Sequence, residues 1–195
     1  METKIFEKYI EYFLEENQKV NLISKNDEKF IKEKHIYDSL SLGLFFDKYK
    51  KPKTLLDIGT GGGFPSVPIS IKYPEITVTA VDSIAKKIRA VTNLKNKLEL
   101  NNLIPICQRA ENLNEQFDTV TSRAVASLDK ICQYALPKVK KGGYFVAFKS
   151  RKINDEIDSS QQVLKKYNSK IIDIISYELP TEEKLERYLI VIQKS

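Results

Sequence analysis

The feature that most constrains the fold is an apolar run that leads directly into a cluster of glycines. The run covers 54–58 and is typical of a buried strand, and the glycines follow as Gly59-Thr60-Gly61-Gly62-Gly63. Residues 64–71 are then typical of a helix, with Pro65 suited to its first turn. Glycine lets the backbone turn sharply and approach a ligand, and a helix start offers free N–H groups and a positive dipole end. Strand, glycine turn and helix in this order predict a ligand-binding α/β unit.

From residue 54 onward, short apolar runs alternate with longer helical patterns. The expected strands cover 54–58, 76–81, 103–108, 117–122 and 144–149, and the expected helices cover 64–71, 84–100, 128–139 and 153–167. This alternation predicts βαβ units and a Rossmann-like, mostly parallel sheet with helices on both faces. Two further apolar runs, 170–177 and 188–193, lie too close together for a helical crossover. We expect these two to pair antiparallel at the sheet edge.

The first 53 residues follow another pattern. Apolar residues from Ile5 to Leu14 recur at helical spacing with Glu and Lys between them, which predicts a surface helix with one buried face. A polar turn is expected over 17–26 and a second helical stretch over 27–49, broken near Gly43. We therefore divide the chain into a helical extension, 1–53, and a Rossmann-like core, 54–195, within a single structural domain.

Composition and charge exclude several classes of protein. With two cysteines, Cys107 and Cys132, no Cys-x-x-Cys spacing and one histidine, no metal site is expected. Both thiols are expected to be buried and reduced. The amino terminus lacks the apolar core of a signal peptide and no run is long enough to span a bilayer, so we expect a cytoplasmic protein without membrane contact. The net charge of +6 weakly favours a polyanionic partner.

The details of the glycine turn indicate which ligand it holds. Dinucleotide sites use Gly-x-Gly-x-x-Gly, whereas here the bulky Phe64 stands in place of the third glycine. Asp57, just before the turn, suits a ligand with an amino group and a sulfonium cation. Asp82 ends the second expected strand, where a carboxylate accepts hydrogen bonds from ribose hydroxyls; the alternative is that it caps the next helix. The combination resembles the first motif of class I methyltransferases, which bind S-adenosylmethionine.

The methyl acceptor is approached by exclusion. Enzymes that methylate amino groups of nucleic acids typically carry Asn/Asp-Pro-Pro-Tyr/Phe after the fourth strand, where this chain has Thr121-Ser122-Arg123-Ala124. Cytosine C5 enzymes need a thiolate, and neither cysteine has the usual context. Guanine N7 has a free lone pair and no proton to lose, so attack on a sulfonium methyl needs mainly positioning. The sequence is compatible with that acceptor, and His35 is expected to be a structural hydrogen-bonding group rather than a base.

Several further segments carry a family resemblance. They are Asn21-Leu22-Ile23, Lys34-His35-Ile36-Tyr37-Asp38-Ser39-Leu40, Asp57 to Pro65, Asp82-Ser83, Arg109-Ala110-Glu111 and Ser122-Arg123-Ala124. In this order they resemble the glucose-inhibited division protein B family, the 16S rRNA guanine-N7 methyltransferases. The resemblance implies methylation of one guanine N7 in the 530 loop, with S-adenosylmethionine as cofactor and 16S rRNA or the small ribosomal subunit as partner. Two departures are Gly62, often Pro or Ala in the family, and Ser150, often Gly.

The resemblance and the glycine turn together give a candidate cofactor site. Its residues are Gly59, Gly61, Gly63, Phe64, Asp82, Ala110, Glu111 and Arg123. No catalytic residue is assigned, and Arg123 is a candidate for positioning. For Glu111 the alternative is a solvated loop acid. For Arg123 the alternatives are a structural ion pair with Asp118 or Asp57, or contact with an RNA phosphate.

Basic residues suggest where RNA would lie. Lys149, Arg151 and Lys152 follow the carboxyl end of the fifth expected strand and are candidates for phosphate contact. Lys140 and Lys141 precede that strand and should lie on another rim of the sheet. We expect a monomer. The rival functions are methylation of a small molecule or protein, and a nucleotide-binding adaptor without catalysis.

Overall fold

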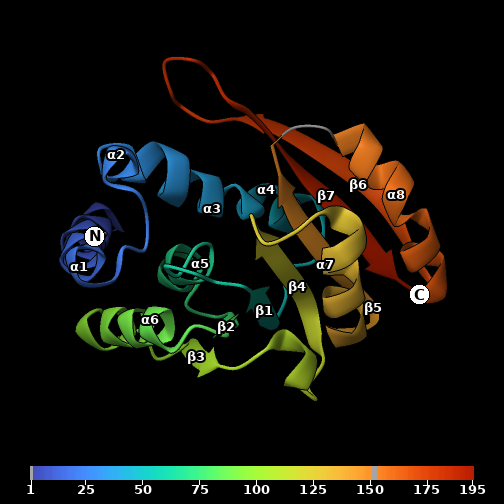
Figure 1. The fold of residues 1–195 in the computed structure, drawn as a ribbon, viewed down its shortest axis with the longest axis horizontal. Coiled ribbons are helices and arrows are strands. Elements are labelled where there is room, and N and C mark those ends of the chain that lie inside the picture. The colour runs from blue at the N-terminus through green and yellow to red at the C-terminus, as the bar shows by residue number, and fades with distance from the viewer. Residues whose placement is uncertain (1, 151–152) are drawn as a thin grey trace.

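A seven-stranded sheet forms the centre of the computed structural model, which describes residues 2–150 and 153–195 (Figure 1). The strand order is β3-β2-β1-β4-β5-β7-β6. Neighbours from β3 to β5 are parallel, whereas β7 runs antiparallel to β5 and β6. The strands are β1 (Thr54–Ile58), β2 (Thr77–Asp82), β3 (Leu103–Cys107), β4 (Phe117–Arg123), β5 (Val139–Lys149), β6 (Ser169–Glu178) and β7 (Glu186–Lys194). The mostly parallel α/β sheet predicted from the sequence is confirmed.

Helices cover both faces of this sheet (Figure 1). One face carries α1 (Glu2–Val20), α4 (Leu42–Lys48), α5 (Ser66–Lys72) and α6 (Ala85–Lys97), and the other carries α7 (Leu128–Ala135) and α8 (Ile153–Lys166). Shorter elements are α2 (Lys25–Glu28), the π-helical segment η1 (Ile31–Tyr37), α3 (Asp38–Leu40) and the 3₁₀ turns η2 (Ala110–Asn112) and η3 (Leu136–Lys138). Across the described ranges, no helix has both the length and the apolar character needed to cross a membrane.

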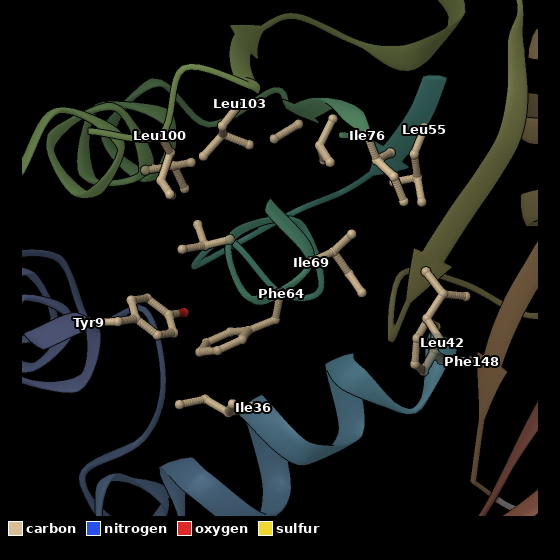
Figure 2. Packing of buried hydrophobic residues seen from close by; sticks show 14 of the residues in the cluster. Tyr9, Ile36, Leu42, Leu55, Phe64, Ile69, Ile76, Leu100, Leu103 and Phe148 are labelled. Atoms are coloured by element: carbon tan, nitrogen blue, oxygen red, sulfur yellow. The ribbon is translucent and has the colours of Figure 1, made fainter. Parts of the chain in front are cut away.

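Two hydrophobic clusters, one on each face, hold the layers together. Leu55 belongs to one cluster and Leu56 to the other, because successive side chains of a strand point to opposite faces. Burial on both faces explains why β1 is a continuous apolar run rather than an alternating one. Tyr9 and Phe13 of α1 are fully buried beside Phe64, and Figure 2 shows Tyr9 to the left of that ring and Ile36 below it. The extension and the core therefore share one hydrophobic interior.

The helical extension departs from the expected pattern in two places. α1 continues to Val20, through part of the expected polar turn. Asn17 lies within this helix, and its buried side chain holds the segment after the helix, where the chain reverses direction. Its Oδ1 accepts the N–H of Ile23 at 2.8 Å and its Nδ2 donates to Glu28 at 2.7 Å. The break expected near Gly43 falls earlier, before α4 begins. Gly43 lies inside α4. A Cβ at this position would lie 2.6 Å from Tyr73 Oη, so the tyrosine hydroxyl occupies the space that a side chain would need.

The carboxyl-terminal strands and the cysteines give two further confirmations and two corrections. The last two strands pair antiparallel as expected, but only β6 lies at the edge, since β7 is inserted between β5 and β6. Cys107 was expected to be buried and is exposed, because it ends the edge strand β3. Cys132 is buried in α7 as expected, and burial raises the pKa of its thiol to about 12.

Candidate functional site

A cleft of about 730 Å³ lies at the carboxyl ends of β4 and β5. Its walls come from η1, the loop 124–127 after β4, the end of β5, the start of α8 and the connection between β6 and β7. The lining residues are Asp27, Lys34, His35, Asp38, Ser122, Arg123, Ala124, Val125, Ala126, Ser127, Ile131, Ala147, Phe148, Lys149, Ser150, Glu156, Leu185 and Arg187. Of the expected site residues that the structure describes, this cleft brings together Arg123 and Lys149. The glycine turn, Asp82, Ala110 and Glu111 are outside its lining.

The glycine turn follows β1 beside this cleft. Gly59, Gly61 and Gly63 have φ angles of +71°, +57° and +93°, which side-chain-bearing residues rarely adopt. A Cβ at Gly63 would lie 2.6 Å from Val67 Cγ2, so this glycine lets α5 pack closely. A Cβ at Gly59 would collide with Val125 of the loop 124–127. At Gly61 the nearest atom would be a backbone oxygen 3.9 Å away, so Gly61 is the position of the three that faces open space.

Asp82 ties the glycine turn to the turn that leads from β2 into α6. Its Oδ2 accepts the N–H of Gly61 at 3.0 Å, and its Oδ1 accepts the N–H of Ile84 at 2.9 Å. The second bond closes a turn before α6 rather than capping it, because Ile84 is the N-cap residue and no described side chain caps this helix start. Each carboxylate oxygen keeps a further lone pair, so ribose contact stays a prediction compatible with this geometry.

Asp57 lies beneath the turn and is fully buried. Neither of its carboxylate oxygens has a hydrogen-bond partner of good geometry among the described residues. Burial raises the pKa of the carboxyl to about 7, and Thr60 and Ser66, whose hydroxyls bond each other at 2.5 Å, offset only part of that effect. A buried acid without a partner is an arrangement that a nearby cation stabilises.

Arg123, at the end of β4, is held by the helical extension. Its Nη1 donates to Asp38 Oδ2 at 2.8 Å, Nη2 lies 3.1 Å from His35 Nδ1, and the guanidinium lies over the Phe64 ring at 5.1 Å. The alternative of a structural ion pair is therefore correct in kind, but the expected partners, Asp118 and Asp57, are wrong. Asp118 lies at the other end of β4, whereas η1 and α3 bring Asp38 across its carboxyl end. Asp38 also accepts a 2.6 Å hydrogen bond from Tyr177.

His35 is a neutral member of this network. Burial, reinforced by the charge of Arg123, lowers the pKa of its imidazole to about 4. Since an arginine can only donate, Nδ1 is the acceptor and the proton is on Nε2, which has no hydrogen-bond partner among the described residues. His35 lines the cleft as a hydrogen-bonding group with a low proton affinity.

The side chain of Phe64 faces the helical extension rather than the cleft. It is 4 % exposed, and its ring centroid lies 5.0 Å from those of Phe13 and His35. Figure 2 shows the ring beside Tyr9 of α1 and above Ile36 of η1. A cofactor contact at Phe64, which stays a prediction, would therefore use its backbone.

Ala110 and Glu111 form the turn η2 after β3, on the same edge of the sheet as Asp82. Ala110 is buried, whereas the Glu111 side chain is exposed. The backbone oxygens of Glu111 and Leu113 accept hydrogen bonds from Lys138 Nζ, which fixes this turn. Their contact with a cofactor stays a prediction.

Lys149 binds the loop 124–127 through its ammonium group. Its Nζ donates to the oxygen of Ala126 at 2.9 Å and pairs with Glu156 Oε2 at 2.5 Å, and the same Oε2 accepts the N–H of Leu128 at 2.7 Å. The Lys149 side chain is 10 % exposed, so a phosphate would have to compete with these partners. Arg151 and Lys152 lie outside the described residues.

Some residues of the cleft were not identified from the sequence. Asp38 was noted only within a family segment, and Val125, Glu156 and Arg187 were not singled out at all. Asp38 and Glu156 become visible only through ion pairs that form when the chain folds, with Arg123 and Lys149 respectively. The seven-residue segment from Lys34 to Leu40 was the one available signal, since it carries two members of the network.

Comparison with known proteins gives matches along nearly the whole chain. The family model described as "GidB: rRNA small subunit methyltransferase G" matches residues 2–185. A protein of Bacillus licheniformis named ribosomal RNA small subunit methyltransferase G is 42 % identical over 195 residues, which cover 97 % of this chain and 81 % of that protein. A protein of the same name from Staphylococcus saprophyticus is 40 % identical over 194 residues, with 97 % and 80 % covered.

Solved structures share the fold. A SAM-dependent methyltransferase of Methanosarcina mazei aligns with a TM-score of 0.60 at 16 % identity, over 77 % of this chain and 96 % of that one. P. horikoshii TYW2 in complex with MeSAdo aligns with a TM-score of 0.63 at 11 % identity, over 82 % of this chain and 62 %, less than two thirds, of that one. The Rossmann-like methyltransferase fold is confirmed. With a family match over 2–185 and relatives at 40 % and 42 % identity, the chain belongs to the rRNA small subunit methyltransferase G family.

Proposed function

We propose that this protein transfers a methyl group from S-adenosylmethionine to N7 of a guanine in the 530 loop of 16S rRNA. Membership of the family supports the coarser activity, methylation of small-subunit rRNA. The choice of N7 comes from the motifs that resemble the guanine-N7 methyltransferases and is supported by the chemistry of the cleft.

The observation that carries the choice of acceptor is that the acids and the histidine lining the cleft are already engaged. Among the described lining residues, Asp27 is paired with Lys34, Asp38 with Arg123, and Glu156 with Lys149. The acceptor nitrogen of His35 faces Arg123. An acceptor that must lose a proton would lack a free base here, whereas guanine N7 attacks with its own lone pair. The N–C bond forms as the C–S bond breaks, and no proton leaves N7.

The residues around the glycine turn fit S-adenosylmethionine. Gly61 faces open space where a ligand can approach the backbone, and Asp57 is an unpartnered buried carboxylate that a cationic ligand would stabilise. In this proposal Gly59, Gly61 and Gly63 shape the binding turn, Asp82 holds the ribose, and Ala110 and Glu111 flank the adenine. The bound cofactor supplies an electrophilic methyl group. Arg123 and His35 shape the wall of the cleft that faces the acceptor.

The experiment is transfer of labelled methyl groups to small subunits, to protein-free 16S rRNA and to a metabolite mixture. We expect label in 16S rRNA, at a guanine in the 530 loop where borohydride and aniline cleave the chain. Label that resists this cleavage would refute N7, and label only in a small molecule or protein would favour the first rival function. Binding of cofactor without transfer to any acceptor would favour the adaptor.

A matched pair of glycine variants tests the cofactor site. Gly61→Ala and Gly142→Ala each place a methyl group in open space at a positive φ, +57° and +76°, so each has a similar backbone cost of about 1–2 kcal/mol. We expect calorimetry to show at least tenfold weaker cofactor binding for Gly61→Ala and unchanged binding for Gly142→Ala. Equal affinities in the two variants would remove the glycine turn from the site.

A monomer and a cytoplasmic location remain part of the proposal.

A further inference from the structure

A second hollow, of about 250 Å³, lies at the amino ends of the central strands, on the opposite side of the sheet from the cleft at their carboxyl ends. The segment 50–53, which leads into β1, forms one side, and the beginning of β5 forms the other. Because β1, β4 and β5 are parallel, their amino ends share this edge and their carboxyl ends share the cleft. Five lysines line the hollow: Lys50, Lys51, Lys53, Lys140 and Lys141.

The positive charge of this hollow is only partly compensated. Lys51 pairs with Glu75 at 2.8 Å and Lys140 pairs with Asp118 at 2.7 Å. Among the described residues, the ammonium groups of Lys50, Lys53 and Lys141 have no ion pair or hydrogen bond of the kind found for Lys51 and Lys140. Within the described part of the chain, Asp118 is the one acid that lines the hollow, and it also accepts the backbone N–H groups of Lys53 and Thr54. A concave surface with surplus charge of one sign concentrates its field on an incoming anion.

The backbone at the start of β5 keeps the hollow open. Gly142 and Gly143, expected as a turn before the strand, lie within β5 where its register against β4 shifts. A Cβ at Gly143 would lie 2.7 Å from the backbone oxygen of Asp118, so the wall here must be bare backbone. At Gly142 a Cβ would meet nothing within 4 Å. Lysines from two distant segments thus surround a space that no described side chain fills.

We propose that this hollow binds the phosphodiester backbone of the RNA substrate, at a place remote from the methylated base; the inference rests on the proposed function. Lysine ammonium groups on flexible stems hold phosphates as point charges, without the forked geometry by which arginine binds a phosphate through two hydrogen bonds. The contact is therefore independent of sequence and depends on salt. Its partner is an RNA large enough to reach both edges of the sheet, which the five residues of β1 separate by roughly 15–20 Å.

The test compares two triple variants with the same change in charge. One carries Lys50→Gln, Lys53→Gln and Lys141→Gln. The control carries Lys4→Gln, Lys8→Gln and Lys165→Gln, at exposed positions on α1 and α8. Binding is measured by filter retention over a range of salt concentrations, for small subunits, protein-free 16S rRNA and a short stem-loop with the target guanine. Thermal unfolding confirms that both variants are folded.

We expect the hollow variant to bind 16S rRNA and subunits roughly tenfold more weakly than the control, with a salt slope smaller by about two. The stem-loop should lose less binding than 16S rRNA, because it offers fewer phosphates to the hollow while its guanine lies in the cleft. Cofactor affinity should not change, since the substituted lysines lie outside the cofactor site. Equal binding of the two variants to 16S rRNA and to subunits would overturn the proposal. A loss seen with subunits but not with 16S rRNA would also overturn it, in favour of an acidic protein surface. Methyl transfer by the parent protein reports separately on the proposed function.

Discussion

The ion pair between Lys149 and Glu156 is predicted to hold the loop that crosses the glycine turn. The side chains are 10 % and 24 % exposed, and the pair also holds Ala126 and the N–H of Leu128. Lys149→Met keeps the apolar stem and removes the ammonium. The Ala126 oxygen then loses its donor, at about 1 kcal/mol, and the Glu156 carboxylate loses its cation.

The magnitude follows from the burial of the pair. Breaking a fully buried pair costs about 3–5 kcal/mol, and the partial exposure of Glu156 reduces that component to about 1–2 kcal/mol. We therefore expect Lys149→Met to lower the free energy of unfolding by about 2–3 kcal/mol. In a protein of this size that corresponds to a decrease in Tm of about 5–10 °C.

The assay is a double-mutant cycle by urea unfolding, with Lys149→Met, Glu156→Gln and the double variant. The expected coupling energy is about 1–2 kcal/mol. The matched control is Lys140 with Asp118, whose side chains are 46 % and 32 % exposed and whose coupling should be below about 1 kcal/mol. A coupling of zero for Lys149 and Glu156, or one smaller than in the control cycle, would refute the reasoning. It would return Lys149 to the role of a phosphate ligand.

Three further predictions concern the buried groups of the site. Asp57 keeps its proton to about pH 7 when folded and to pH 3.8 when unfolded, so it contributes stability at low pH that is lost as pH rises between these values. The stability of Asp57→Asn relative to the parent should therefore increase as pH rises through that window, by up to about 4 kcal/mol, as measured by urea unfolding at each pH. A difference between the two proteins that does not change with pH would contradict this prediction. His35 has the opposite sign: the unfolded chain takes up the proton first below pH 6.5, and the parent loses stability as pH falls towards 4. In His35→Gln the free energy of unfolding should fall by about 2 kcal/mol less over this pH range than in the parent, after allowance for the partial exposure of His35. Parallel stability profiles of the two proteins would exclude this role for His35. Phe64→Ala should lower the free energy of unfolding by about 3–5 kcal/mol, because it removes a buried ring that also contacts the Arg123 guanidinium. The change is measured from Tm, and a loss below about 1 kcal/mol would show that the ring is not part of the core.

Local patterns in the sequence predict what local physics determines. β1 is predicted to the residue, because its burial on both faces leaves a continuous apolar run and the glycines that follow need positive φ. The sequence could not supply the partner of Arg123. Asp38 reaches it only through the folding of η1 and α3 over β4, and nothing near Arg123 in the chain indicates that approach.

The same limit explains the outcome for Lys149. Its position after a strand and beside other basic residues suggested an RNA ligand. Its pairing with Glu156 depends on how α8 returns to the sheet. Charge in a sequence shows which groups are present, whereas the fold decides which of them remain available to a ligand.

The position of β7 has a consequence for the order in which the molecule is assembled. Synthesis delivers this strand after β5 and β6, yet it is the strand that joins them. On the ribosome, β6 has no neighbour in the sheet until the residues from Glu186 onward have emerged. A nascent or shortened chain that ends before Glu186 exposes the unpaired edge of β5, beside the wall of the cleft, and only a chain that includes β7 can close it.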